Sequence, residues 1–234
     1  MPIKGVLFDK DGTLLDFQAT WLPVLREAAA AAAGGEGESA RHLLAVGGYD
    51  TSLEQVRAGS LLAAGNTAEI AAAWASHLPG RGLRDLIALL DRIFVEGGAR
   101  HATPVTELGP LFARLKDRGL ALGVATSDSL QGARASLAGF GVLERIDFLA
   151  GYDSGHGVKP NPGMVEGFCA TTGLPAAQVA VVGDNLHDLE MGRAAGAGLV
   201  VGVLSGNGVC GELQALADHV LDSIAEIEAL LDGL

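Results

Sequence analysis

Lysine is scarce in this chain of 234 residues, in which Asp and Glu outnumber Lys and Arg by 28 to 16 and the formal net charge is −12. Nucleic acids and anionic membrane surfaces bind clusters of Lys and Arg, so we expect neither as a partner. The negative charge of an anionic ligand would have to be compensated within the binding site, by a metal ion, a lysine or helix N-termini. The lysines available for this are Lys4, Lys10, Lys116 and Lys159.

Cysteines are few, and long apolar runs are lacking. Cys169 and Cys210 form neither a CxxC pair nor a zinc pattern, which favours a reduced, cytoplasmic setting. No apolar run reaches the about 20 residues of a membrane-spanning helix. No signal peptide is recognisable, because Asp9 interrupts the apolar N-terminal run. We therefore expect a cytoplasmic protein.

What the chain has is an alternation of apolar strands and helices. Hydrophobic residues make up 49% and charged residues 19%, as in a globular protein with a sizeable core. Helical patterns separate the short apolar runs, which predicts βαβ units and a parallel sheet. The predicted strands are residues 3–8, 121–125, 148–150, 179–182, 199–203 and 220–221.

The alternation is interrupted between residues 17 and 98, where only helical patterns occur. Within this block, Ser52 followed by Gln55 resembles a capping box that opens a helix over residues 52–64. Gly97 and Gly98 close the block. We predict a Rossmann-like three-layer α/β core with a parallel sheet, formed by residues 1–16 and 99–234, and an inserted α-helical cap domain formed by residues 17–98.

Polar side chains follow three of the predicted strands at the point where each strand ends. Asp9 and Asp11 follow the first, Thr126 and Ser127 the next, and Asp184 a later one. Ligands of open α/β sheets bind at the carboxyl ends of the strands. These residues are therefore expected to converge on one crevice.

Three carboxylates in one crevice repel one another unless a cation lies among them. Oxygen ligands from few side chains suit Mg²⁺, so Asp9, Asp11 and Asp184 suggest a magnesium site. Solvated loop acids are the alternative for a lone DxD pair. An EF-hand is excluded, because Gly12 comes too early and Thr20 occupies the position of the bidentate glutamate.

Other polar residues could complete a phosphate site. Lys159 lies on a loop between glycines and prolines and could offset phosphate charge, although a solvated lysine is the commoner case. Thr126 and Ser127 could bind phosphoryl oxygens or simply cap a helix. Asp188 lies four residues after Asp184, on the same face of any helix that begins there.

Together these patterns resemble the four motifs of the haloacid dehalogenase-like (HAD) phosphohydrolase superfamily. Residues 9–14 (DKDGTL) resemble the first motif, Thr126 the second, Lys159 the third, and the Gly183-Asp184-x-x-x-Asp188 stretch the fourth. The order agrees, and the helical insertion lies where that family has its helical cap. The likeness is greatest to phosphoglycolate phosphatase-like members.

The resemblance implies a role for each residue. Asp9 would be the nucleophile that forms an aspartyl-phosphate, and Asp11 the general acid and then the base. Mg²⁺ would bind the Asp9 carboxylate, the Asp11 backbone carbonyl and Asp184. Asp188 would orient Lys159 or the metal's waters. Lys159 would be catalytic and would bind phosphate together with Thr126 and Ser127.

The implied activity is Mg²⁺-dependent hydrolysis of a small phosphate monoester, such as phosphoglycolate or a sugar phosphate, by a monomer or homodimer. Asp11 disfavours dehalogenases and phosphonatases, which lack that second acid. Lys10, Ser127 and Asp128 depart from the phosphoglycolate phosphatase pattern, which leaves the substrate open. The alternatives are a β-phosphoglucomutase-like phosphomutase, a non-catalytic binding protein on the same fold, and a metal-storing acid cluster.

Two further features bear on ligand binding. Residues 206–211 (GNGVCG) fit the dinucleotide-binding pattern GxGxxG, but they lie near the C-terminus and favour a flexible loop beside the site. Phe17 and Trp21 are interpreted as packing at the cap hinge. The cap residues that could contact an anionic substrate are Arg57, Arg81, Arg84 and His42.

Overall fold

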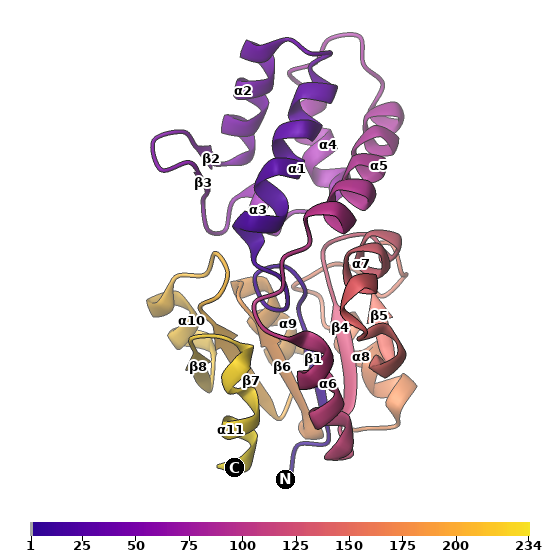
Figure 1. Ribbon diagram of the computed structural model, residues 1–234, viewed down its shortest axis with the longest axis vertical. Coiled ribbons are helices and arrows are strands. Elements are labelled where there is room, and N and C mark those ends of the chain that lie inside the picture. Colours follow the sequence, from indigo (N-terminus) through magenta and orange to yellow (C-terminus); the bar gives the residue numbers. More distant parts are fainter. Residues whose placement is uncertain (1) are drawn as a thin grey trace.

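The computed structural model describes residues 2–234, which form two lobes joined at a narrow waist (Figure 1). The lower lobe contains a six-stranded sheet with the order β5-β4-β1-β6-β7-β8, in which every neighbouring pair is parallel. This confirms the predicted α/β fold class and its parallel sheet. The strands are β1 (Gly5–Phe8), β4 (Ala121–Ala125), β5 (Phe148–Ala150), β6 (Val179–Gly183), β7 (Leu199–Val203) and β8 (His219–Leu221).

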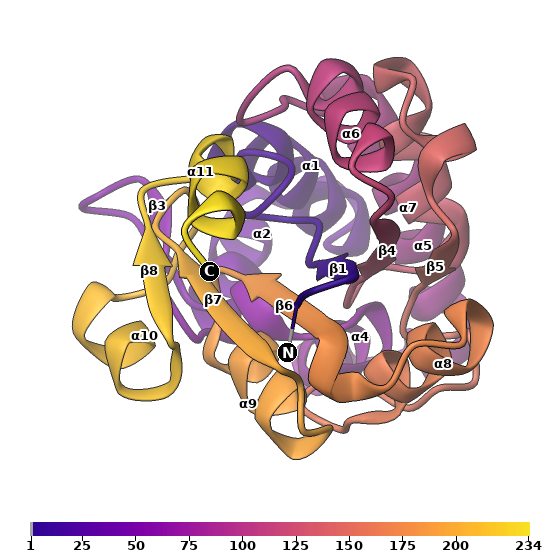
Figure 2. The same ribbon diagram turned by 90° about the horizontal axis from the view of Figure 1, so that it is seen from below.

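Helices cover both faces of this sheet, as Figure 2 shows from below. Along β1, Val6 and Phe8 join the apolar cluster on the side of α6 and α11, while Leu7 joins the cluster on the side of α8. Strands buried on both faces read as continuous apolar runs, which is why they were predictable. The core helices are α6 (Leu108–Asp117), α7 (Leu130–Leu137), α8 (Gly163–Thr172), α9 (Leu186–Ala194), α10 (Cys210–Leu216) and α11 (Ile227–Asp232).

The upper lobe has an apolar core of its own, built around the fully buried Trp74. Helix α5 continues to His101, past Gly97 and Gly98, so the predicted end of this helical block at those glycines is wrong by one turn. The glycines are instead buried inside the helix. The helices of this lobe are α1 (Phe17–Ala32), α2 (Gly37–Gly47), α3 (Leu61–Ala64), α4 (Thr67–Ala75) and α5 (Leu83–His101).

The prediction of a helix over residues 52–64 is wrong. Strands β2 (Tyr49–Asp50) and β3 (Gln55–Val56) pair there as a short antiparallel hairpin, and only α3 is helical. The Asp50 carboxylate accepts hydrogen bonds from the backbone N–H groups of Ser52 and Leu53. Such an Asx turn offers the backbone an alternative to the helix, and it outweighs the helical pattern of the sequence.

Capping boxes occur at other helices. The Asn66 side chain accepts a hydrogen bond from the Glu69 N–H, and the Glu69 carboxylate accepts one from the Asn66 N–H, at the start of α4. Asn185 and Asp188 form the same reciprocal pair at the start of α9. The second pair fixes the direction of the Asp188 carboxylate in the first turn of α9.

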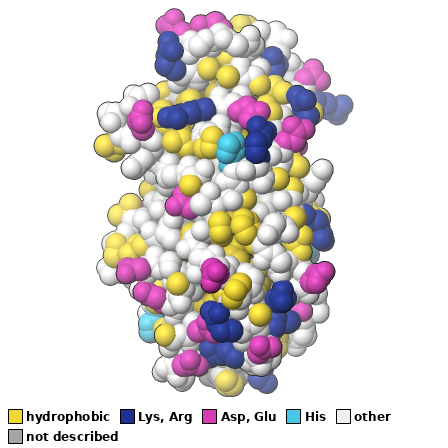
Figure 3. All heavy atoms as spheres, in the orientation of Figure 1, with side chains coloured by type: hydrophobic (Ala, Val, Ile, Leu, Met, Phe, Trp, Pro, Cys, Tyr) yellow, Lys and Arg dark blue, Asp and Glu magenta, His cyan; other side chains and the backbone are white. Residues whose placement is uncertain are grey.

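Charges of both signs are mixed on the surface. On the face in Figure 3, Lys and Arg side chains lie interspersed with Asp and Glu. Across residues 2–234, none of the helices combines the length and the apolar character needed to cross a bilayer.

Helix α5 packs along α1, and two adjacent glycines of α5 face different surroundings. A Cβ at Gly97 would lie 2.7 Å from Val24 Cγ1, whereas a Cβ at Gly98 would have its nearest neighbours at 3.9 Å. We expect Gly97→Ala to lower the free energy of unfolding by about 1–3 kcal/mol through overpacking. We expect Gly98→Ala to raise it by up to about 1 kcal/mol, because alanine favours the helix interior. Urea unfolding of both variants checks this, and equal effects would contradict it.

Candidate active site

Asp9 lies in the middle of the sheet edge at which the strands end. Phe8 pairs with Val124 of β4 on one side and Val182 of β6 on the other, and the Asp9 N–H donates to the Val182 carbonyl at 2.8 Å. Residues that follow β4 and β6 therefore flank Asp9. This register brings Thr126 and Asp184 to the same place.

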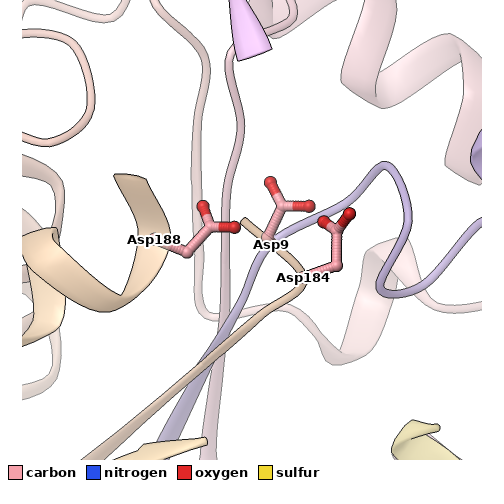
Figure 4. Close-up of side chains that lie close together, drawn as sticks. All are labelled: Asp9, Asp184 and Asp188. Carbon is pink, nitrogen blue, oxygen red and sulfur yellow. The ribbon is translucent and has the colours of Figure 1, made fainter. Parts of the chain in front are cut away.

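The carboxylates of Asp9, Asp184 and Asp188 form a buried cluster at this edge (Figure 4), with oxygen atoms within 4.8 Å of one another. Burial raises the pKa of Asp9 to about 7, against the opposing effect of Lys159. Burial also raises the pKa of Asp184, and the charges of Asp9 and Asp188 add to that effect. Carboxylates that resist ionisation in this way are stabilised when a cation lies among them.

Lys159 supplies one positive charge to the cluster. Its Nζ lies 2.5 Å from Asp9 Oδ1 and 2.6 Å from Asp188 Oδ1, with the side chain only 3% exposed. Burial alone would lower the pKa of this ammonium, but Asp188 and Asp9 outweigh it and hold the pKa above its usual range. The loop lysine is thus a buried ion-pair partner of Asp9.

Hydrogen bonds decide which carboxylate oxygens stay available. Asp188 Oδ1 accepts a hydrogen bond from Lys159 Nζ, and Asp188 Oδ2 accepts one from the backbone N–H of Asn185. Asp184 Oδ2 accepts from the Asn207 N–H at 2.9 Å. Within residues 2–234, Asp9 Oδ2 and Asp184 Oδ1 accept no hydrogen bond, so these two oxygens can take a further ligand.

Two glycines allow the backbone to approach Asp184 closely. Gly12 has a φ of 91°, and a Cβ there would lie 2.4 Å from Asp184 Oδ2. A Cβ at Gly206 would lie 2.0 Å from the same oxygen. The Ser205 hydroxyl donates to the Gly12 carbonyl at 2.8 Å and joins the two loops. The glycine loop over residues 206–211 therefore orients Asp184, a contact that sequence reasoning missed.

Asp11 lies at the same cavity and is bound by a buried lysine. Lys10 Nζ lies 2.8 Å from Asp11, 3.1 Å from Asp128 and 5.2 Å from the centre of the Trp21 ring. Burial acts to lower the pKa of Lys10, but Asp11 and Asp128 outweigh it and raise that pKa. Of the three residues whose departure left the substrate open, Lys10 and Asp128 are thus partners of one ion pair.

One cavity between the lobes brings the predicted site residues together. Phe17 and Trp21, interpreted from the sequence as hinge packing, also line it, whereas Arg57, Arg81, Arg84 and His42 do not. The predicted site residues that line it are Asp9, Asp11, Thr126, Ser127, Lys159, Asp184 and Asp188.

The Lys10–Asp128 pair predicts a coupled effect on stability. Lys10→Met leaves the buried Asp128 carboxylate without its cation, which costs about 3–5 kcal/mol in such pairs. The double variant Lys10→Met with Asp128→Asn removes that unpaired charge, so we expect it to recover part of the loss. Chemical unfolding of both single variants and of the double variant gives the coupling energy, and strictly additive effects would contradict it.

Known phosphatases and a hydrolase family resemble this chain in sequence. The model of the haloacid dehalogenase-like hydrolase family matches residues 3–196. The chain is 29% identical to the N-acetylmuramic acid 6-phosphate phosphatase of Pseudomonas aeruginosa, covering 84% of this chain and 80% of that protein. It is 28% identical to a phosphoglycolate phosphatase of Cupriavidus necator, covering 99% and 94% respectively.

The solved structures agree at the level of the fold. CbbY from Rhodobacter sphaeroides, in complex with phosphate, superposes with a TM-score of 0.74 at 23% identity, covering 98% of this chain and 99% of that one. The family match extends from before β1 through α9, and so includes Asp9, Lys159 and Asp184. The chain belongs to the haloacid dehalogenase-like hydrolase family.

Proposed function

We propose that this chain is a Mg²⁺-dependent phosphatase that hydrolyses a small phosphate monoester through an aspartyl-phosphate on Asp9. The observation that supports this most is the joint placement of Asp9, Asp11 and Lys159 in one cavity. A buried carboxylate, a cation beside it and a second acid nearby are the parts that phosphoryl transfer to a carboxylate requires. The relatives named as phosphatases support the same reaction class.

The residues fit a magnesium ion. The free Asp9 Oδ2 and Asp184 Oδ1 are hard oxygen donors, and we propose the Asp11 backbone carbonyl as the third protein ligand. Mg²⁺ with few protein ligands supplies charge neutralisation at the phosphoryl oxygens. Both oxygens of Asp188 are already engaged, which favours its role in positioning Lys159 over direct metal binding.

In the first step, Asp9 attacks phosphorus and the bond from phosphorus to the ester oxygen breaks. Asp11 in its protonated form gives its proton to the departing alkoxide, so the alcohol leaves neutral and Asp11 becomes a carboxylate beside Lys10. Lys159 offsets the charge of the phosphoryl group as it approaches Asp9. Thr126 and Ser127, which line the same cavity, bind phosphoryl oxygens.

In the second step, Asp11 takes a proton from water, and the water oxygen attacks phosphorus. The bond from phosphorus to Asp9 breaks, which frees inorganic phosphate and restores the Asp9 carboxylate, while Asp11 is protonated again as at the start. One water is consumed for each ester. A phosphomutase would instead return the phosphoryl group to a substrate hydroxyl, so the release of one phosphate per alcohol distinguishes the two.

The substrate, the cellular location and the oligomeric state stay predictions. Phosphoglycolate and a sugar phosphate are the substrates that the sequence resemblance suggests, and the named relatives act on different phosphate esters. A cytoplasmic location, from the composition, and a monomeric or homodimeric state, from the resemblance, are likewise proposals.

The nucleophile is tested by substitution. We expect Asp9→Asn to lower kcat for an aryl phosphate in Mg²⁺ by roughly 10³ or more, because the amide cannot form the phosphoenzyme. We expect Asp11→Ala to lower it as well, through loss of the proton donor. Phosphate release measures both. The control is Glu190→Gln, an exposed carboxylate on α9, which should retain full activity, and full activity in well-folded Asp9→Asn would refute the assignment.

Metal binding predicts a pH-dependent stability. Burial raises the pKa of Asp9 from 3.8 to about 7, so in that window the folded, metal-free protein holds a proton that the unfolded chain has lost. The free energy of unfolding of the metal-free protein therefore falls as pH rises through the window. Because Mg²⁺ competes with protons for the carboxylates, we expect it to stabilise the protein more at about pH 8 than at about pH 5.5.

Thermal unfolding with and without Mg²⁺ measures this effect. At about 100 times its Kd the ion adds about 2.7 kcal/mol, which corresponds to roughly 5–10 °C in Tm. The comparison variant is Asp184→Asn, which should lose most of the shift. An equal Tm shift at both pH values would show that the ion does not bind these carboxylates.

A further inference from the structure

The side of the cavity that belongs to the upper lobe is apolar. Helix α1 contributes Phe17, Trp21 and Leu25, and every one of these side chains is more than nine-tenths buried. Trp21 packs edge-on against Phe94 of α5, with ring centres 5.4 Å apart. We call this surface the apolar roof, formed by Phe17, Trp21, Leu25, Leu62, Ile70 and Phe94.

The apolar roof offers no cation to a substrate. The cations expected to contact an anionic substrate lie elsewhere: His42 pairs with His77 on the exposed surface, and Arg57 and Arg84 are exposed. Lys159 lines the cavity but is paired with Asp9 and Asp188. Lys10, whose Nζ lies 5.2 Å from the centre of the Trp21 ring, is likewise paired with Asp11 and Asp128. A carboxylate on the leaving group would thus be desolvated against aromatic rings without a partner, which is costly.

The roof also offers few hydrogen bonds. Among its neighbours from the upper lobe, Thr67 is the polar side chain that lines the cavity, and the backbone of residues 63–65 runs beside it. Sugar hydroxyls need several partners when they are buried. From the lower lobe, Asn185 and His187 also line the cavity, at the start of the helix that carries Asp188, so we assign them to the phosphoryl end.

We propose that the phosphate monoester cleaved by this enzyme carries an uncharged, apolar leaving group, aryl or branched alkyl, which packs under the apolar roof. This deepens the proposed function and rests on it. The carboxylate cluster and Lys159 bind the phosphoryl end, and the roof binds the alcohol end. The phosphate esters of glycolate and of polyhydroxylated sugars do not suit the roof.

Three esters of primary alcohols provide a matched test: benzyl phosphate, 2-phosphoglycolate and ribose 5-phosphate. Phosphate release from each by the wild-type chain in Mg²⁺ gives kcat/KM. We expect benzyl phosphate to exceed both others by at least about tenfold, since burying the ring is favourable and burying an unpaired charge is not. A higher kcat/KM for phosphoglycolate or for ribose 5-phosphate would overturn the proposal.

A pair of lysine substitutions on α4 isolates the roof. Ile70 lines the cavity, whereas Ala72 on the same helix is exposed. We expect Ile70→Lys to raise the ratio of kcat/KM for phosphoglycolate to that for benzyl phosphate by about tenfold, because it supplies the missing cation. Ala72→Lys adds the same charge outside the cavity and should leave the ratio unchanged. Equal ratios in the two folded variants would count against the roof.

Acetyl phosphate separates this proposal from the proposed function. Its acyl group is too small to use the roof, so its Mg²⁺-dependent hydrolysis reports the phosphoryl site alone. Hydrolysis of acetyl phosphate without a preference for benzyl phosphate would overturn the apolar leaving group and leave the phosphatase standing. No hydrolysis of any ester would overturn both. The wild-type comparison decides the proposal even where Ile70→Lys fails to fold.

Discussion

The site depends on one buried cation held between two carboxylates. Lys159 joins Asp9, at the end of β1, to Asp188, in the first turn of α9. Without it, three buried acids would lie together with no compensating charge among their protein neighbours, an arrangement that costs several kcal/mol per ion. The lysine therefore permits the carboxylates to be buried, where weak screening by solvent strengthens their interaction with any charged group that binds beside them.

The parallel sheet supplies the other half of this arrangement. Because β1 lies between β4 and β6, the side chains that follow the carboxyl ends of these three strands lie together at one edge of the sheet. Gly12 and Gly206 then bring two loops against Asp184 where any Cβ would collide with its carboxylate. Position and charge are thus fixed together: the strands place the acids, and the loops hold one oxygen of Asp184 while the other stays free.

The sequence predicts the lobe that contains the six-stranded sheet well and the upper lobe less well, for physical reasons. Strands buried on both faces leave continuous apolar runs, and acids at their ends stand out against them. The hairpin of β2 and β3 leaves no such pattern, because it has only two residues per strand and its turn rests on Asp50. The partnership of Lys10 with Asp128 was equally hidden, since residues far apart in the chain reveal an ion pair only after folding.

Gln18 of α1 connects the upper lobe, including the hairpin that the sequence did not predict, to the carboxylate site. The Gln18 amide donates to the Val56 carbonyl in β3 at 3.2 Å and to Asn207 Oδ1 at 2.8 Å. The Asn207 backbone N–H in turn donates to Asp184. The residue that holds Asp184 is therefore bound by the first turn of α1 and, through it, by the hairpin. The same hydrogen bonds therefore tie α1, which carries part of the apolar roof, to the loop that orients Asp184.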